Sequence, residues 1–270
     1  MNNILSLCIF KNMQIEFYKY QGTGNDFILL DNRQGNFPIN DTKRVSRMCD
    51  RHFGIGADGL ILLEDDPVVD FHMVYYNSDG RIGSLCGNGG RCMVSFARDL
   101  GIIDSSATFR ASDGLHSATI EGDTVSLKMN DVKEIREKPN YLFLDTGSPH
   151  HVQLVGNLEQ LPVKEEGARL RYGLYGKKGS NINFVEPVSK NTFAIRTYER
   201  GVEDETLSCG TGVTAVALAM HHLGKADNTE IQINTRGGQL MVRFETQAGG
   251  YRNIFLKGPA RQVFKGSWPC

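Results

Sequence analysis

Two short cysteine-containing elements carry the most specific chemistry in the sequence. Cys86-Gly87-Asn88-Gly89 recurs 123 positions later as Cys209-Gly210-Thr211-Gly212. Each element stands just before a predicted helix, and the first backbone N–H groups of a helix lack internal partners and can hold an anion. Because thiolates are stabilised at such places, we expect a lowered pKa for both cysteines. A substrate carboxylate could use the same N–H groups.

Two thiols on opposite sides of one carbon suit stereoinversion. One thiolate removes a proton from one face of the carbon, and the other thiol delivers a proton to the opposite face. The helix N-termini stabilise the negative charge that builds on an adjacent carboxylate. Neither pyridoxal phosphate nor another cofactor is then required, but water must be excluded from the site.

The other four cysteines, Cys8, Cys49, Cys92 and Cys270, are interpreted as packing residues. Six scattered cysteines do not form a disulfide framework, which favours a reduced, cytoplasmic setting. No CxxC pair or second close pair of Cys and His occurs, so no metal site is predicted. A net charge of -1 provides no basic field for nucleic acid. No apolar run approaches the roughly 20 residues of a membrane span.

The spacing of the cysteine elements links further landmarks, which indicates an internal duplication. It relates Thr23-Gly24 to Thr146-Gly147, Gly56 to Gly179, Gly101 to Gly224 and Gly114 to Gly237. Strand-like runs at 71–76 and 193–198 lead to the two elements. The helix predicted after each element is apolar, and the stretch 213–220 is apolar on nearly every face, as in a fully buried helix. Two strands joined at a glycine turn follow each helix.

These repeats predict an α+β protein of two similar halves, each a mixed sheet around one central helix. We place the halves at residues 13–131 and 140–268. The charged stretch 132–139 is the predicted linker. Residues 1–12 lack the basic start and cleavage site of a signal peptide and are interpreted as an N-terminal extension or as the result of an upstream start codon.

From Met13 onward the chain resembles diaminopimelate epimerase over essentially its full length. The motifs that carry the resemblance follow the family's order: Gly-Thr-Gly-Asn-Asp-Phe at 22–27, Gly-Ile-Gly-Ala-Asp-Gly at 54–59, Asn-Ser-Asp-Gly at 77–80, the first cysteine element, Ser-Pro-His at 148–150, Asn181, Tyr-Glu-Arg-Gly at 198–201 and the second cysteine element. Each motif is weak alone, and the ordered set is specific. The resemblance implies two pseudo-symmetric, barrel-like domains with the site in the cleft between them.

The resemblance also implies an activity and its residues. The activity is cofactor-independent interconversion of LL- and meso-2,6-diaminopimelate in lysine and peptidoglycan-precursor synthesis, by a cytoplasmic homodimer. Cys209 is then the base for the LL substrate and Cys86 the acid, while His150 and Glu199 adjust the cysteine pKa values. The implied substrate-binding residues are Asn25, Asn77, Gly87, Asn88, Ser148, Asn181, Glu199, Arg200, Gly210 and Thr211.

Three positions depart from the commoner family pattern. Gly59 stands where many members have a substrate-contacting glutamine, and Ser148 stands where the family often has asparagine. Phe264 replaces a tyrosine that is linked to dimer contacts in some relatives.

Other interpretations stay open on sequence alone. A proline or hydroxyproline racemase shares the two-cysteine logic, but its substrate does not need the ionic clamp of Arg200 and Glu199. Isomerases of the same fold that carry a carboxylate in place of a cysteine are disfavoured by the two intact cysteines. A thiol–disulfide protein would turn over with redox partners. An amino-acid-binding protein without activity would bind diaminopimelate and leave its α-proton in place.

Overall fold

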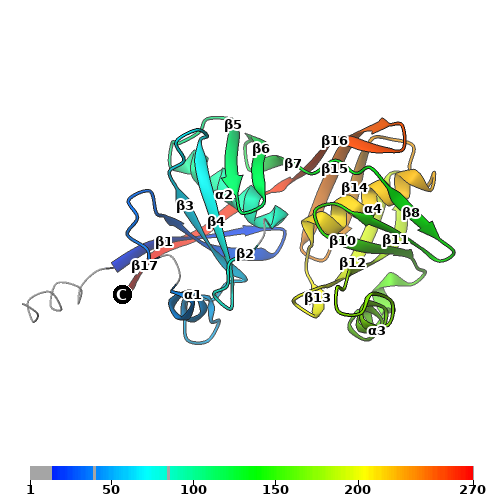
Figure 1. Cartoon of the computed structure of the whole chain (residues 1–270), viewed down its shortest axis with the longest axis horizontal. Coiled ribbons are helices and arrows are strands. Elements are labelled where there is room, and N and C mark those ends of the chain that lie inside the picture. Colours follow the sequence, from blue (N-terminus) through cyan, green and yellow to red (C-terminus); the bar gives the residue numbers. More distant parts are fainter. Residues whose placement is uncertain (1–13, 39–40, 84–85, 270) are drawn as a thin grey trace, which may run out of the picture.

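Two lobes make up the molecule, and in each of them a mixed β-sheet wraps around one helix (Figure 1). The structure is a computed structural model and describes residues 14–38, 41–83 and 86–269. The predicted extension at 1–12, together with Cys8 and Cys270, lies outside the described residues. No helix in this part of the chain is long and apolar enough to cross a membrane.

The first lobe contains β1 (Gln14–Gly22), β2 (Asn25–Asp31), α1 (Thr42–Cys49), β3 (Gly59–Glu64), β4 (Phe71–Asn77), α2 (Gly87–Asp99), β5 (Ser106–Ala111), β6 (Gly114–Glu121) and β7 (Thr124–Lys128). The second contains β8 (Ile135–Lys138), β9 (Tyr141–Asp145), β10 (Pro149–Leu154), the 3₁₀ helix η2 (Leu158–Gln160), α3 (Val163–Tyr175), β11 (Asn181–Ser189), β12 (Thr192–Glu199), β13 (Asp204–Thr206), α4 (Gly210–His222), β14 (Glu230–Thr235), β15 (Gly238–Gln247) and β16 (Gly250–Pro259). A last strand, β17 (Arg261–Pro269), ends the described chain. The run from β1 to β7 is repeated from β9 to β16 in the second lobe, with η2 and β13 added.

The strand pairing is repeated as well. In the first lobe β2 is parallel to β3, β3 is antiparallel to β4, and β4 is parallel to β5. In the second lobe β10 is parallel to β11, β11 is antiparallel to β12, and β12 is parallel to β14. Parallel neighbours need a crossover connection; α1 and α2 lie in those crossovers in the first lobe, and α3 and α4 in the second. The predicted duplication is therefore confirmed by topology.

Glycines with positive φ mark equivalent turns in the two lobes. Gly101 and Gly224, which follow α2 and α4, have φ values of 71° and 66°. The hairpin after each helix shows a one-residue difference from the predicted repeat. Gly114 pairs with Ala111 across its turn, and the residue in the same place in the second lobe is Gly238, paired with Thr235. The counterpart of Gly114 is therefore Gly238, and the correspondence between Gly114 and Gly237 that was predicted from sequence is wrong.

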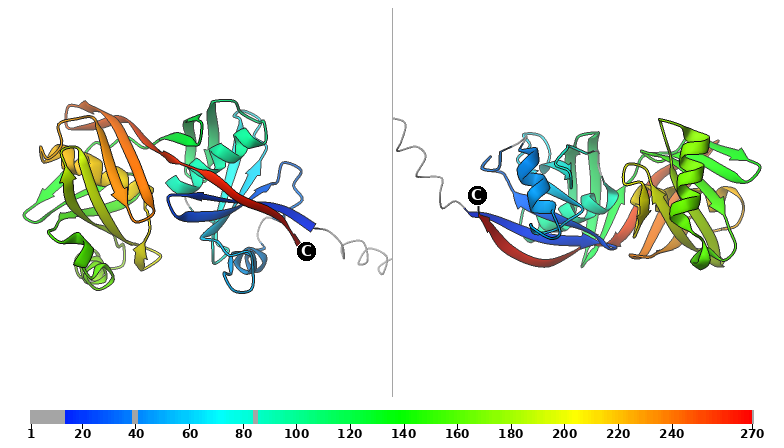
Figure 2. Two further views of the ribbon diagram at one scale, coloured as in Figure 1. Left: turned by 180° about the vertical axis from the view of Figure 1, so that it is seen from behind. Right: turned by 90° about the horizontal axis from the view of Figure 1, so that it is seen from below.

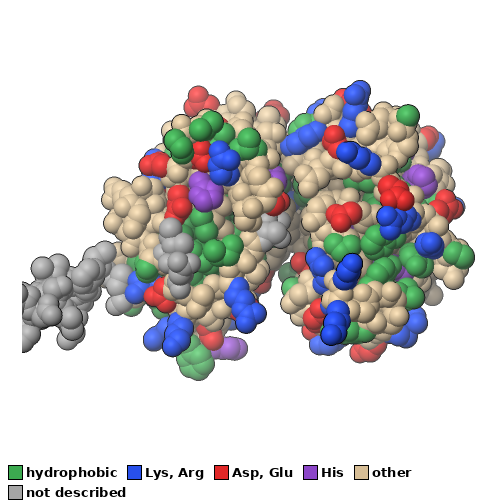
Figure 3. All heavy atoms as spheres, viewed as in Figure 1, with side chains coloured by type: hydrophobic (Ala, Val, Ile, Leu, Met, Phe, Trp, Pro, Cys, Tyr) green, Lys and Arg blue, Asp and Glu red, His purple; other side chains and the backbone are tan. Residues whose placement is uncertain are grey.

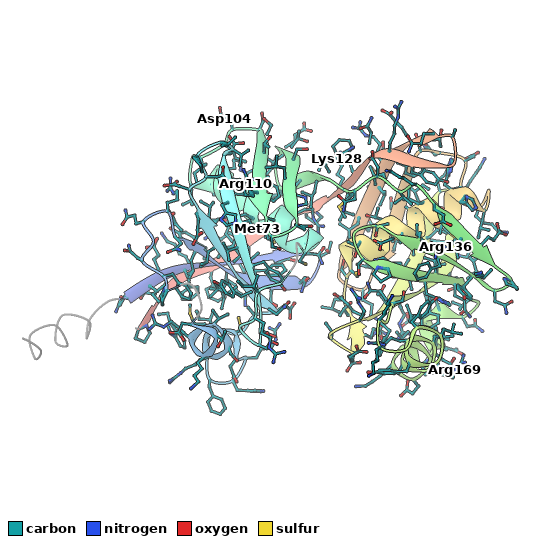
Figure 4. All side chains as sticks on the ribbon, viewed as in Figure 1. Met73, Asp104, Arg110, Lys128, Arg136 and Arg169 are labelled. Atoms are coloured by element: carbon teal, nitrogen blue, oxygen red, sulfur yellow. The ribbon has the colours of Figure 1, made fainter. Side chains whose placement is uncertain are left out.

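One strand of each repeat belongs to the sheet of the other lobe. β17 comes from the second half of the chain but pairs antiparallel with β1, and Figure 2 shows it crossing back to lie beside that strand. β8 pairs with β9, and Figure 4 shows Arg136 of β8 on the second lobe. β7 and β16 pair with each other at the join. The structure differs from the predicted boundaries in two ways. The predicted linker 132–139 contains the strand β8, whose exposed charged side chains are typical of a loop. The second half of the chain ends with β17 in the first lobe.

The central helices are buried by the sheets around them. The α4 residues from Val213 to Met220 are all buried, as their apolar pattern predicts. α2 is buried from Gly87 to Ala97. Cys92 on α2 and Cys49 on α1 lie in apolar core clusters, in line with the packing interpretation. Burial of both helices fixes where their first residues, and with them the cysteine elements, must lie.

Candidate active site

The N-termini of α2 and α4 meet where the two lobes join. Cys86 is the N-cap residue of α2 and Cys209 that of α4, and both have extended backbone. A Cβ atom placed on Gly210 would lie 3.4 Å from the Cα atom of Gly87. The two helix starts thus approach as closely as glycine backbones allow. On the face shown in Figure 3 a furrow runs between the lobes, with charged side chains of both signs scattered around it.

Asparagine side chains link the two cysteine elements. Asn25 Oδ1 lies 3.6 Å from Cys86 Sγ and accepts a hydrogen bond from Asn88 Nδ2 at 3.2 Å. The Asn88 amide also donates to the backbone oxygen of Ser208 at 3.1 Å, directly before Cys209. Asn88 Oδ1 is buried and has no hydrogen-bond partner among the described residues. An acceptor is therefore left over beside the helix starts.

Burial opposes the effect of the helix N-termini on both thiols. Cys209 is 7% exposed, and its pKa is raised, first by burial and then by the Glu199 carboxylate. Burial also raises the pKa of Cys86 to about 11, against the opposing effect of the Gly89 and Asn88 backbone N–H groups. The predicted lowering of both pKa values is therefore wrong for this closed site, because desolvation of the thiolate exceeds its stabilisation by N–H groups.

On the second lobe Ser148, Asn181 and Arg200 form one hydrogen-bonded group. Asn181 Nδ2 donates to Ser148 Oγ at 2.9 Å, and the backbone N–H of Arg200 donates to Asn181 Oδ1 at 2.8 Å. The Arg200 guanidinium donates to the Lys178 carbonyl oxygen at 3.0 Å. It has no carboxylate partner among the described residues. The group therefore presents a cation that is open to an added carboxylate.

Glu199 and Thr211 border the cysteines from the same lobe. Glu199 accepts a hydrogen bond from Thr206 Oγ1 at 2.9 Å, and burial raises the pKa of its carboxyl group. Its charge acts on both Cys86 and Cys209. Thr211 Oγ1 lies 3.5 Å from Cys209 Sγ. Glu199 is therefore near enough to influence both thiols.

Tyr75 fills the room that the missing side chain of Gly59 leaves. A Cβ atom on Gly59 would lie 2.6 Å from Tyr75 Cε2 and 2.5 Å from the backbone oxygen of Tyr76. The exposed Asn77 is the cross-strand partner of Gly59. A Cβ position on Gly83 lies 3.2 Å from Asn77 Nδ2 and is also close to the Tyr75 ring. Sequence reasoning missed Tyr75, although a glycine predicted to pair near an aromatic residue was a usable signal.

His150 is fully buried beside the group formed by Ser148, Asn181 and Arg200. Its Nδ1 atom lies 3.1 Å from Nδ2 of Asn183, on the neighbouring strand β11. Burial and the Arg200 cation lower the pKa of His150 to about 3, so the ring is neutral near neutral pH. Sequence reasoning also missed Asn183, whose only signal is a polar residue within the apolar run of β11.

Among the residues that the structure describes, no metal cluster marks the cysteine site. Within the described ranges, no three His, Cys, Asp or Glu side chains are grouped so that they could hold a metal ion. A hollow of about 380 Å³ lies at the join, bordered by residues that include Asn130, Lys133 and Phe143, but neither cysteine lines it. The chemistry of the side chains, and not cavity size, locates the site.

Comparison with known proteins relates the whole chain to one family. The diaminopimelate epimerase family model matches residues 17–135 and 142–263. The diaminopimelate epimerase of Flavobacterium psychrophilum is 59% identical over 253 residues, which cover 93% of this chain and 99% of that protein. The diaminopimelate epimerase of Chlorobaculum tepidum is 44% identical over 257 residues, which cover 91% and 98%.

Solved structures of more distant sequences share the fold. A phenazine biosynthesis protein of the PhzF family from Bacillus anthracis superposes with a TM-score of 0.78 at 13% identity, covering 96% of this chain and 100% of that one. A hydroxyproline epimerase from Agrobacterium vitis gives a TM-score of 0.70 at 15% identity, covering 95% and 92%. The predicted α+β fold, with two pseudo-symmetric sheets around central helices, is confirmed. By the match of its sequence over both lobes, this chain belongs to the diaminopimelate epimerase family.

Proposed function

We propose that this protein interconverts LL- and meso-2,6-diaminopimelate by a two-base mechanism without a cofactor. One observation carries the proposal: Cys86 and Cys209 cap two helices whose first glycines are nearly in contact. A carboxylate held by both helix starts has a thiol on each side of its α-carbon. The family membership supports diaminopimelate as the substrate.

The chemistry moves one proton at each face of the α-carbon. In the LL-to-meso direction the Cys209 thiolate takes the α-proton, so that the C–H bond breaks as an S–H bond forms. The Cys86 thiol then gives its proton to the opposite face and becomes the thiolate. Backbone N–H groups at Gly87–Asn88 and Gly210–Thr211 stabilise the charge that builds on the carboxylate. Proton exchange with water resets the pair.

The rest of the substrate is a long zwitterion that needs charged and amide partners. We assign the distal carboxylate to Arg200, whose planar fork matches it and donates to Ser148 Oγ and to the Lys178 carbonyl oxygen. Glu199 takes an ammonium group, which offsets the burial of its carboxylate. Asn25 and Asn77 supply neutral donors and acceptors from the first lobe.

We place the enzyme in the cytoplasm, in the synthesis of lysine and peptidoglycan precursors, and we propose that it is a homodimer. Val263 and Phe264 on β17 are 58% and 45% exposed, and they offer an apolar surface for a second copy. Sedimentation of the parent protein and of Phe264→Lys tests this assembly. A dimer that Phe264→Lys weakens is expected, and a monomeric parent would contradict the proposal.

A substrate panel tests the activity. Purified protein is incubated with LL-diaminopimelate, L-proline and trans-4-hydroxy-L-proline, and the stereoisomers are separated by chiral chromatography. We expect inversion of diaminopimelate alone, and no inversion by folded Cys86→Ala or Cys209→Ala. Inversion of a proline substrate instead would assign a racemase, and full activity in either cysteine variant would rule out the two-base scheme.

A further inference from the structure

Asn183 is a fully buried amide whose hydrogen-bonding groups are all used. Its Nδ2 donates to the backbone oxygen of His151 at 2.9 Å and lies 3.1 Å from Nδ1 of His150. Its Oδ1 accepts a hydrogen bond from Thr197 Oγ1 at 3.0 Å. Because the His151 carbonyl oxygen can only accept, this contact fixes which end of the amide is the NH₂ group.

The orientation of the amide determines where His150 carries its proton. One hydrogen of Asn183 Nδ2 goes to the His151 oxygen, and the other points at His150 Nδ1, which must therefore accept. A neutral imidazole then carries its hydrogen on Nε2. That atom is buried and has no hydrogen-bond partner among the described residues. A buried donor without an acceptor is unfavourable, so an acceptor is expected when a ligand binds.

His150 lies beside the residues that are assigned to the distal carboxylate. His150 pairs with Asn181 in the parallel register of β10 and β11, whereas Asn183 pairs with Val152, one step further along the strands. Nδ1 is held on the Asn183 side of the ring. Asn181, the strand partner of His150, accepts a hydrogen bond from the backbone N–H of Arg200. The Arg200 cation also acts electrostatically on this ring.

The first lobe has no polar pair like Asn183 and His150 at the equivalent positions. The matching parallel pair, β2 and β3, places Phe27 opposite Gly59 and Leu29 opposite Ile61. Phe27 is therefore the counterpart of His150, and Ile61 is the counterpart of Asn183. Since the same framework folds with apolar side chains at both places, packing alone does not require the polar pair. A role in the site accounts for it.

We propose that Asn183 is a positioning residue, which holds His150 as the neutral Nε2–H form so that this N–H donates to the substrate carboxylate that Arg200 binds. The inference rests on the proposed function and deepens it. In this proposal His150 is a permanently neutral hydrogen-bond donor. It is not the charged or proton-exchanging histidine that would adjust the cysteine pKa values.

Nuclear magnetic resonance tests the tautomer without substrate. Long-range ¹H–¹⁵N correlation spectra of the ¹⁵N-histidine-labelled full chain show which ring nitrogen carries hydrogen, and the His150 signals are those lost in His150→Gln. We expect Nε2–H in the parent protein at about pH 6 and about pH 8. In Asn183→Asp the carboxylate, once ionised at about pH 8, can only accept, so we expect Nδ1–H there instead. Nε2 without hydrogen in the parent, or an unchanged tautomer in Asn183→Asp, would overturn the assignment.

Kinetics then test whether the donor is used. We expect kcat/KM for diaminopimelate to fall by about tenfold or more in Asn183→Asp and Asn183→Leu, as when a hydrogen bond to a charged group is lost. Asn183→Leu has an aliphatic side chain like its counterpart, and so provides a variant that keeps the fold if Asn183→Asp does not. Ile61→Val, at the matching position of the first lobe, is the control and should keep both tautomer and kcat/KM. Parent-like kcat/KM in folded Asn183→Leu would refute the role. If the chain fails to epimerise diaminopimelate at all, the tautomer result still stands, so the two proposals fail separately.

Discussion

Asn88 on α2 donates its side-chain amide to the backbone oxygen of Ser208, 3.1 Å away and one residue before Cys209. The same amide contacts Asn25 Oδ1, which lies 3.6 Å from Cys86 Sγ. One side chain therefore connects the surroundings of both sulfur atoms across the join. Correct spacing of the two thiols depends on this contact as well as on the helices.

Asn88→Ala removes the contact and leaves the Ser208 carbonyl oxygen and Asn25 without their donor. We expect kcat/KM to fall by at least about tenfold and the free energy of unfolding to fall by about 1–3 kcal/mol, the effect of leaving buried polar groups unpaired. Steady-state kinetics and urea unfolding measure the two effects. A variant with parent-like kcat/KM would show that the contact does not set the spacing of the thiols.

Arg200→Lys replaces a planar fork with a point charge. The distal carboxylate then loses its paired hydrogen bonds, so we expect KM to rise roughly tenfold with a smaller change in kcat. Arg169→Lys is the matched control, because Arg169 forms an exposed pair with Glu166 on α3. An unchanged KM in Arg200→Lys would remove Arg200 from the binding group.

Gly59→Ala forces a Cβ atom against Tyr75 and the Tyr76 carbonyl oxygen, at 2.6 and 2.5 Å. We expect a loss of about 1–3 kcal/mol in the free energy of unfolding, as for other overpacked sites. Gly156→Ala is the control, since nothing lies within 4 Å of its Cβ position. Chemical denaturation of both variants measures the difference. Equal stability would mean that Tyr75 moves aside at little cost.

Stability should fall with acid because two histidines are buried in neutral form. Burial lowers the pKa of His150 to about 3 and that of His151 to about 4, whereas both are near 6.5 in an unfolded chain. Below about pH 6.5 the unfolded state therefore binds protons that the folded state does not, and stability present above this pH is lost. Each histidine contributes a slope of at most about 1.4 kcal/mol per pH unit. Urea unfolding between about pH 6.5 and pH 5 should show the decline, and His151→Gln should make it shallower. A flat profile would contradict the burial of both rings.

Much of the fold could be predicted because the duplication left local marks. Glycines such as Gly101 and Gly224 have a positive φ, which few other residues adopt, and the glycines of the Cys-Gly-x-Gly elements lie close to neighbouring atoms, so their spacing survives in sequence. The exchange of β8 and β17 could not be predicted in the same way. Strand pairing partners lie in tertiary contacts, and β8 is almost wholly exposed, so its sequence resembles a charged loop.

The site was only partly predictable for a related reason. Residue types and a family resemblance pointed to Cys86, Cys209 and Arg200, but the sign of the cysteine pKa shifts depends on burial, which is a property of the folded structure. Asn183 acts through another residue, and its sequence carries only a polar side chain in an apolar strand. A residue that acts through another, as Asn183 does through His150, can be recognised only once the register of β10 and β11 is known.

The central claim is that one sulfur removes a proton and a different sulfur returns one. Incubation with LL-diaminopimelate in heavy water, stopped at low conversion and followed by chiral separation and mass spectrometry, tests it most directly. The account predicts deuterium at the inverted carbon of the meso product and almost none in the recovered LL substrate. Deuterium appearing in recovered substrate as fast as in product would show a single base serving both faces, and would contradict the account.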